Sequence, residues 1–110
     1  MEIIKLQIPA NTVYLKSIRL LAASLASDMG FDIEKVEDIR VVVSEACNMK
    51  MKKDDIKIKF ILDSDFMQIE VIGEDKEIDT ENLSIQKIIL EQLADRVEIE
   101  DTKIKLTKEK

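Results

Sequence analysis

The chain has 110 residues and a mass of 12.6 kDa, a length that predicts a single domain over residues 1–110. Its 45% hydrophobic and 36% charged residues are typical of a globular protein, and its net charge of −6 argues against binding nucleic acid through phosphates. The absence of histidine excludes a Ser-His-Asp or Cys-His catalytic arrangement and histidine-ligated zinc. Gly30 and Gly73, the two glycines, lie too far apart to form a glycine-rich phosphate loop.

The first elements that we expect are a strand and a helix. Apolar and polar residues alternate over Glu2–Ile8, which predicts a strand that Pro9 ends. Asn11 or Thr12 can cap a helix, and Gly30 stands where a glycine commonly follows a helix end. The apolar positions of this helix recur at steps of three and four, at Leu15, Ile18, Ala22, Leu25 and Met29.

A second helix is expected from Asp32, which can cap it, to about Lys50. The β-branched residues within Ile39–Val43 are poor helix formers, so by propensity alone this segment could be a short strand. The spacing of the apolar positions on both sides favours a helix that depends on tertiary packing. Its apolar stripe is Val36, Ile39, Val43, Ala46 and Cys47.

The second half of the chain begins with two alternating segments, Ile56–Leu62 and Phe66–Ile72, which predict a hairpin. An acidic connector, Glu74–Asn82, leads to a helix over Leu83–Ala94. We expect that helix to turn four apolar side chains inward, at Ile85, Ile88, Ile89 and Leu93.

Val97–Glu100 and Lys103–Leu106 predict a last hairpin. The order is then β-α-α-β-β-α-β-β. It indicates an α+β fold, a two-layer α/β sandwich with a mixed, mostly antiparallel sheet. The helices are expected on one face, and the other face is left open to solvent or to a partner.

Three segments resemble the bacterial anti-sigma factor serine kinases of the GHKL, or histidine kinase-like ATPase, superfamily. They are Ile8-Pro9-Ala10, the run from Met29-Gly30-Phe31 through Val43-Ser44-Glu45-Ala46-Cys47, and Leu93-Ala94-Asp95-Arg96-Val97-Glu98-Ile99. The resemblance implies the Bergerat type of two-layer fold. It also implies a serine/threonine kinase whose substrate is an anti-anti-sigma protein.

In that family the glutamate at the position of Glu45 is the proposed general base for the attacking hydroxyl, and an asparagine four residues later holds Mg²⁺ against the phosphates. This chain has Met49 at the second position, and a thioether is a poor ligand for a hard cation. Asn48 is adjacent but turned about 100° around the helix.

The family's nucleotide motifs are replaced as well. Gly73 stands where the resemblance places an adenine-reading aspartate, and Asp75 and Glu77 stand at its two glycine positions. Two carboxylates there would repel phosphates. The family's lid is absent from the sequence, and its second glycine pair maps onto Ser84 and Gln86. For Cys47 we expect a small buried apolar role.

The resemblance with these departures predicts an anti-sigma-factor-like regulator, a pseudokinase that acts by protein–protein interaction with no cofactor. Its expected partners are a sigma factor or an anti-anti-sigma protein, with no nucleic acid and no membrane. The alternative is an active ATP-dependent kinase that uses Glu45 as base, with Asn48 reaching Mg²⁺. A third reading is a small dimerising domain outside transcription. The start of the chain lacks a signal-peptide pattern, so we expect a cytoplasmic protein, and family likeness implies a homodimer.

Overall fold

The structure, a computed structural model, describes residues 1–51, 54–73 and 80–110, with the side chains of the third helix described from Ile85 onward. The elements are β1 (Glu2–Ile8), the 3-10 turn η1 (Thr12–Tyr14), α1 (Leu15–Asp28), α2 (Ile33–Lys50), β2 (Ile56–Leu62), β3 (Phe66–Ile72), α3 (Thr80–Leu93), β4 (Arg96–Ile99) and β5 (Lys103–Glu109). This is the expected order of strands and helices, with η1 added before α1.

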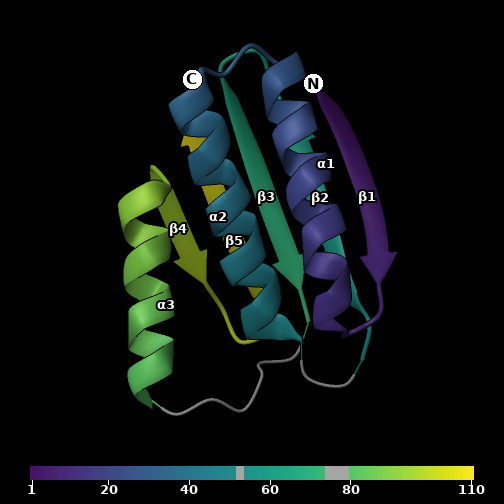
Figure 1. Ribbon diagram of the computed structural model, residues 1–110, viewed down its shortest axis with the longest axis vertical. Coiled ribbons are helices and arrows are strands. Elements are labelled where there is room, and N and C mark those ends of the chain that lie inside the picture. The colour runs from purple at the N-terminus through teal and green to yellow at the C-terminus, as the bar shows by residue number, and fades with distance from the viewer. Residues whose placement is uncertain (52–53, 74–79) are drawn as a thin grey trace.

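The strands form one sheet in the order β1-β2-β3-β5-β4, and each of its described pairings is antiparallel. All three helices cover the same face of this sheet, with α2 between α1 and α3 (Figure 1). In the described part of the chain no element covers the opposite face. The α+β two-layer sandwich expected from the sequence is therefore confirmed, with a sheet whose described pairings are all antiparallel where a mixed sheet was expected.

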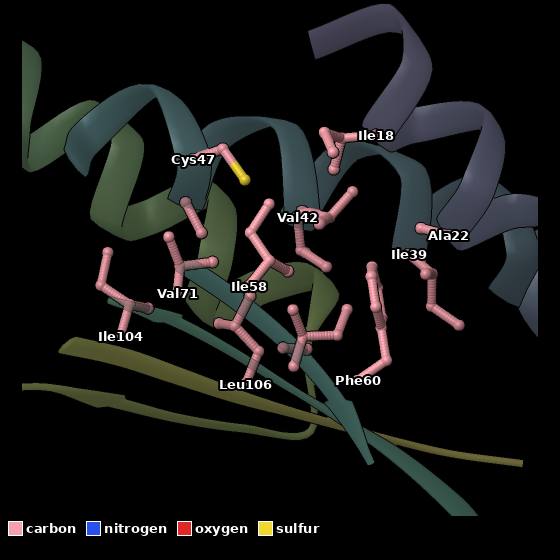
Figure 2. Packing of buried hydrophobic residues seen from close by; sticks show 14 of the residues in the cluster. Ile18, Ala22, Ile39, Val42, Cys47, Ile58, Phe60, Val71, Ile104 and Leu106 are labelled. Carbon is pink, nitrogen blue, oxygen red and sulfur yellow. The ribbon is translucent and has the colours of Figure 1, made fainter. Parts of the chain in front are cut away.

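The core lies between the two layers, because alternation along each strand turns one row of apolar side chains toward the helices. Ile58 and Phe60 of β2 and Leu106 of β5 are at most 1% exposed and meet Ile39 and Val42 of α2 (Figure 2). Burying an aliphatic or aromatic side chain of this size contributes roughly 1.5–3 kcal/mol. This packing also explains why the β-branched part of α2 is helical, since tertiary contacts override its weak propensity.

The ends of the helices are fixed by the residues that the sequence predicts. Asn11 Oδ1 accepts a hydrogen bond from the backbone N–H of Val13 at 3.0 Å and so caps η1. Asp32 Oδ1 accepts one from the N–H of Lys35 at 3.0 Å and caps α2. Gly30 adopts φ +91°, a conformation that side chains disfavour, and this glycine ends α1.

The third helix differs from the expectation in its start and in its buried stripe. It begins at Thr80, earlier than Leu83, and the charged positions 74–79 of the connector lie outside the described residues. Ile85 and Ile88 were expected inward but are 51% and 52% exposed, while Leu90 is fully buried. The physical reason is position: α3 lies at the edge of the helical layer, so it buries only a narrow stripe toward α2 and β4.

Among the described residues, the structure contains no helix with the length and apolarity needed to cross a membrane.

Candidate functional site

The candidate residues Glu45 and Asn48 both belong to the C-terminal half of α2. They are three residues apart, so the helix places them at neighbouring positions on one side, and both are half-buried. Met49 points elsewhere and is 3% exposed. The structure thus brings the two candidate polar residues to one side of α2 and turns the thioether of Met49 into the core.

The last residue of α2, Lys50, is one of the largest fully buried side chains, at 1% exposure. Its Nζ donates hydrogen bonds to the backbone carbonyls of Glu100 at 3.3 Å and Asp101 at 3.2 Å, in the turn between β4 and β5. A buried ammonium group needs such acceptors, because leaving it unpaired would cost several kcal/mol. Lys50 therefore fastens the end of α2 to the last hairpin.

Gly73 lies against the same end of α2. Its N–H donates to the carbonyl of Thr102 at 2.9 Å. A Cβ built on Gly73 would lie 2.9 Å from Ile56 Cγ2, closer than real Cβ atoms approach, and 3.2 Å from the backbone oxygen of Lys50, which is tighter than most real contacts. The position to which the resemblance assigns an adenine-reading aspartate is thus filled by packed neighbours and has no room for a side chain.

Cys47 is fully buried in the core, as its sequence position predicted (Figure 2). Burial raises the pKa of its thiol from 9.0 to about 12, because a thiolate would lose its hydration there. At neutral pH the sulfur is therefore a protonated, apolar core atom and no nucleophile.

Two sets of hydrogen bonds between distant residues, the polar ties, connect the elements around Glu45 and Asn48. The sequence predicted neither of them. Arg19 of α1 donates to Ser44 Oγ of α2 at 3.2 Å. Lys108 of β5 donates to Asp38 Oδ2 at 3.1 Å and to the backbone carbonyl of Leu93 at 2.6 Å, which joins β5 to α2 and α3. The sequence carries no local signal for either tie, since the partners lie 15 to 70 residues apart.

Three surface hollows of the molecule lie away from Glu45 and Asn48. Hollows of about 480 and 530 Å³ lie on the sheet face away from the helices, and one of about 350 Å³ lies beside the two chain termini. None of these three is lined by Glu45 or Asn48. In the described part of the molecule, no group of three or more acidic or cysteine side chains could hold a metal ion.

The described residues do not fit a bound Mg²⁺–nucleotide of the kind that the resemblance implies. The magnesium-ligand position is a buried thioether at Met49, and the adenine-reading position at Gly73 is closed. At Gln86, to which the resemblance assigns a glycine facing the phosphates, the buried Oε1 has no hydrogen-bond partner among the described residues, and this oxygen is an acceptor, as phosphate oxygens are. No step through a nucleotide can be derived from this set of groups.

No family model matches the chain. Among curated proteins it is similar to serine-protein kinase RsbW of Bacillus cereus strain Q1, with 35% identity over 88 residues, 74% of this chain and 55% of the relative. It is also similar to the RsbW proteins of Bacillus pumilus, with 33% identity over 84 residues (68% and 51%), and of Bacillus subtilis strain 168, with 29% over 85 residues (71% and 53%). The chain spans about half the length of these relatives. Sequence similarity and fold together show that it belongs to the bacterial anti-sigma factor serine-protein kinase family.

Proposed function

We propose that this protein is an anti-sigma-factor-like regulator that acts by binding proteins, without using a nucleotide. It sequesters a sigma factor or binds an anti-anti-sigma protein. Family membership supports the kind of partner, and the end of α2 supports the mode of action. The observation that carries the proposal is the closed packing around Gly73, where a Cβ would come within 2.9 Å of Ile56.

Because the space around Gly73 is filled, the C-terminal end of α2 contributes to the stability of the fold. In a kinase of this family the corresponding positions have to stay open to a ligand and polar toward it. Here Met49 and Met51 are 3% and 4% exposed, and Lys50 Nζ donates to the carbonyls of Glu100 and Asp101 in the last hairpin. These contacts stabilise the fold in the absence of any ligand, as a pure binding module requires.

An active ATP-dependent serine/threonine kinase is the second candidate function. One observation favours it: Glu45 and Asn48 are half-buried neighbours on one side of α2, so a base and an oxygen ligand lie at adjacent positions. Its test is phosphotransfer from ATP to an anti-anti-sigma protein. Loss of transfer in Glu45→Ala, with partner binding unchanged, would establish this alternative.

The partner is tested by purifying the tagged full chain from the cells that make it and identifying bound proteins by mass spectrometry. The proposal expects a sigma factor or an anti-anti-sigma protein in the eluate, with the same yield whether or not MgATP is added. Recovery of neither class would favour a dimerising domain outside transcription. Partners of this kind are cytoplasmic, and we propose that location and a homodimeric state, which sedimentation of the purified protein would test.

A further inference from the structure

The outer face of the sheet, opposite the helices, has a charge of opposite sign to the whole chain. Strand alternation and pairing place six cations on it, namely Lys5, Lys57, Lys59, Lys103, Lys105 and Arg96. Three carboxylates of the strands share the face, namely Glu70, Glu98 and Glu109, and two more lie beside it, namely Asp55 and Asp95. Six cations against these five carboxylates leave the face with a small positive excess, on a chain whose net charge is −6.

Part of this positive charge is not compensated within the fold. Lys5 lies directly opposite Lys59 across β1 and β2, an arrangement that costs stability. Glu70 offsets some of it, with its carboxylate oxygens 3.5 Å from Lys59 Nζ and 3.6 Å from Lys103 Nζ. Lys5 and Lys57 form no ion pair with any described residue. In the part of the chain that the structure describes, no carboxylate accounts for Lys5 and Lys57 on this face.

The uncompensated lysines surround a hollow. Its volume is about 480 Å³, and its lining residues are Lys5, Leu6, Gln7, Lys57, Ile58, Lys59 and Ile72. Among the residues that the structure describes, no carboxylate lines it. Two described carboxylates contact lining side chains from outside it: Asp55 Oδ2 accepts from Gln7 Nε2 at 2.8 Å, and Glu70 Oε2 lies 3.5 Å from Lys59 Nζ. The hollow therefore combines three ammonium groups with an apolar floor at Ile72, which is 36% exposed.

We infer that the outer face over β1, β2 and β3 docks an acidic segment of a partner protein. Carboxylates of the segment pair with Lys5, Lys57 and Lys59, and one of its apolar side chains covers Ile72. The inference rests on the proposed function, in which the chain acts by binding proteins, and adds the surface and the chemistry of the partner. Charge complementarity steers such encounters and fixes their register.

Two other occupants fit this face less well. A single nucleic-acid strand stacks its bases on aromatic rings, and the face offers one, Phe66, away from the lysines of the hollow. A second copy docking through the same face would oppose cations with cations. An acidic polypeptide instead meets both the lysines and the exposed apolar side chains between them, such as Ile3 at 51% exposure.

The test uses the full chain and a fluorescein-labelled deca-glutamate peptide at low salt, followed by fluorescence anisotropy and by amide chemical shifts. We expect binding that weakens as salt rises, with shifts concentrated in β1, β2 and β3. The double charge reversal Lys5→Glu and Lys57→Glu should weaken binding at least tenfold. The matched control reverses two exposed lysines of the helical layer, Lys16→Glu and Lys87→Glu, with the same change in net charge and an expected effect under twofold.

Equal losses of peptide affinity in the two double variants would overturn the inference. Binding would then depend on the net charge of the chain and not on the lysines of this face. Tighter binding of a dT decamer than of deca-glutamate would assign the face to nucleic acid, and a dimer that dissociates in the Lys5/Lys57 variant would assign it to a second copy. Both variants are first checked for unchanged thermal unfolding. No sigma factor enters the assay, so its failure is distinct from a failure to recover a transcription partner from cells.

Discussion

The C-terminal end of α2 and the outer face of the sheet contrast in how their residues are used. At the end of α2, two positions to which the resemblance assigns nucleotide contacts are packed: Met49 is buried and Gly73 touches its neighbours, and the adjacent Lys50 is buried as well. On the outer face, Lys5 and Lys57 are exposed and form no ion pair with any residue that the structure describes. The residues at the end of α2 stabilise the fold. The lysines of the outer face carry charge that the stability of the fold does not require. Substitutions at the α2 end should therefore destabilise the protein, and those on the outer face should not.

Among substitutions measured at neutral pH, the largest effect is expected for Met49→Asn, which introduces the asparagine that the resemblance places at this position. The amide would enter a site where the side chain is 3% exposed, and burying it without partners costs about 3 kcal/mol including lost packing. Urea unfolding measures this loss. Glu45→Gln, on the half-exposed side of the same helix, is the control and should change stability by less than about 1 kcal/mol.

Gly73→Ala should cost about 2 kcal/mol, because the added Cβ forces Ile56 or the backbone of Lys50 to move. Gly73→Asp should cost at least as much, since it carries the same Cβ. Thermal unfolding of both variants checks this. An alanine variant as stable as the native chain would show that the position is open, which would restore room for an adenine-reading side chain.

Lys50→Met should cost about 1.5 kcal/mol. The stem of the side chain is retained, but the hydrogen bonds from Nζ to the carbonyls of Glu100 and Asp101 are lost. Hydrogen exchange should be faster in the β4–β5 turn. Lys16→Met on the exposed side of α1 is the matched control, with an expected change within about 0.5 kcal/mol. Equal effects of the two substitutions would contradict the structural role of Lys50.

The buried thiol predicts a dependence of stability on pH. The folded-state pKa of Cys47 is raised from 9.0 to about 12, so the folded protein retains a proton that the unfolded chain loses above pH 9. Stability from this group is complete below pH 9 and declines between pH 9 and 12, by roughly 1.4 kcal/mol per pH unit. Cys47→Ala should flatten that part of the curve, and a slope that persists unchanged would assign it to other groups.

The smallest effect has the opposite sign. Lys5→Glu replaces a like-charge pair with Lys59 by an opposite-charge pair, and we expect a gain of about 0.5 kcal/mol at low salt. The gain should shrink as salt rises. A loss of stability in this variant would mean that the outer face is under the same packing constraint as the end of α2, and the contrast between the two regions would fail.

Much of the fold follows from local patterns in the sequence. Alternation predicted β1, β2 and β3, and the caps at Asn11 and Asp32 predicted the helix starts, because each signal depends on residues a few positions apart. The stripe of α3 could not be predicted in the same way. Apolar residues at most positions from 85 to 93 fit more than one helical face, and only the edge position of α3 selects the one with Leu90.

The candidate site was predictable only in part. Positions of Glu45, Asn48 and Met49 on α2 follow from helical spacing, but the burial of Lys50 depends on the distant β4–β5 turn. The charge of the outer face likewise depends on register, since Lys5 and Lys59 are far apart in sequence and meet only through strand pairing.

Regulation by protein binding without a nucleotide is tested most directly by titrating MgATP into the purified full chain and following heat and melting temperature. The proposed function predicts no saturable heat and no rise in melting temperature at millimolar MgATP. A dissociation constant below about 100 µM, roughly −5.5 kcal/mol, would contradict it and would favour the kinase with Glu45 as base.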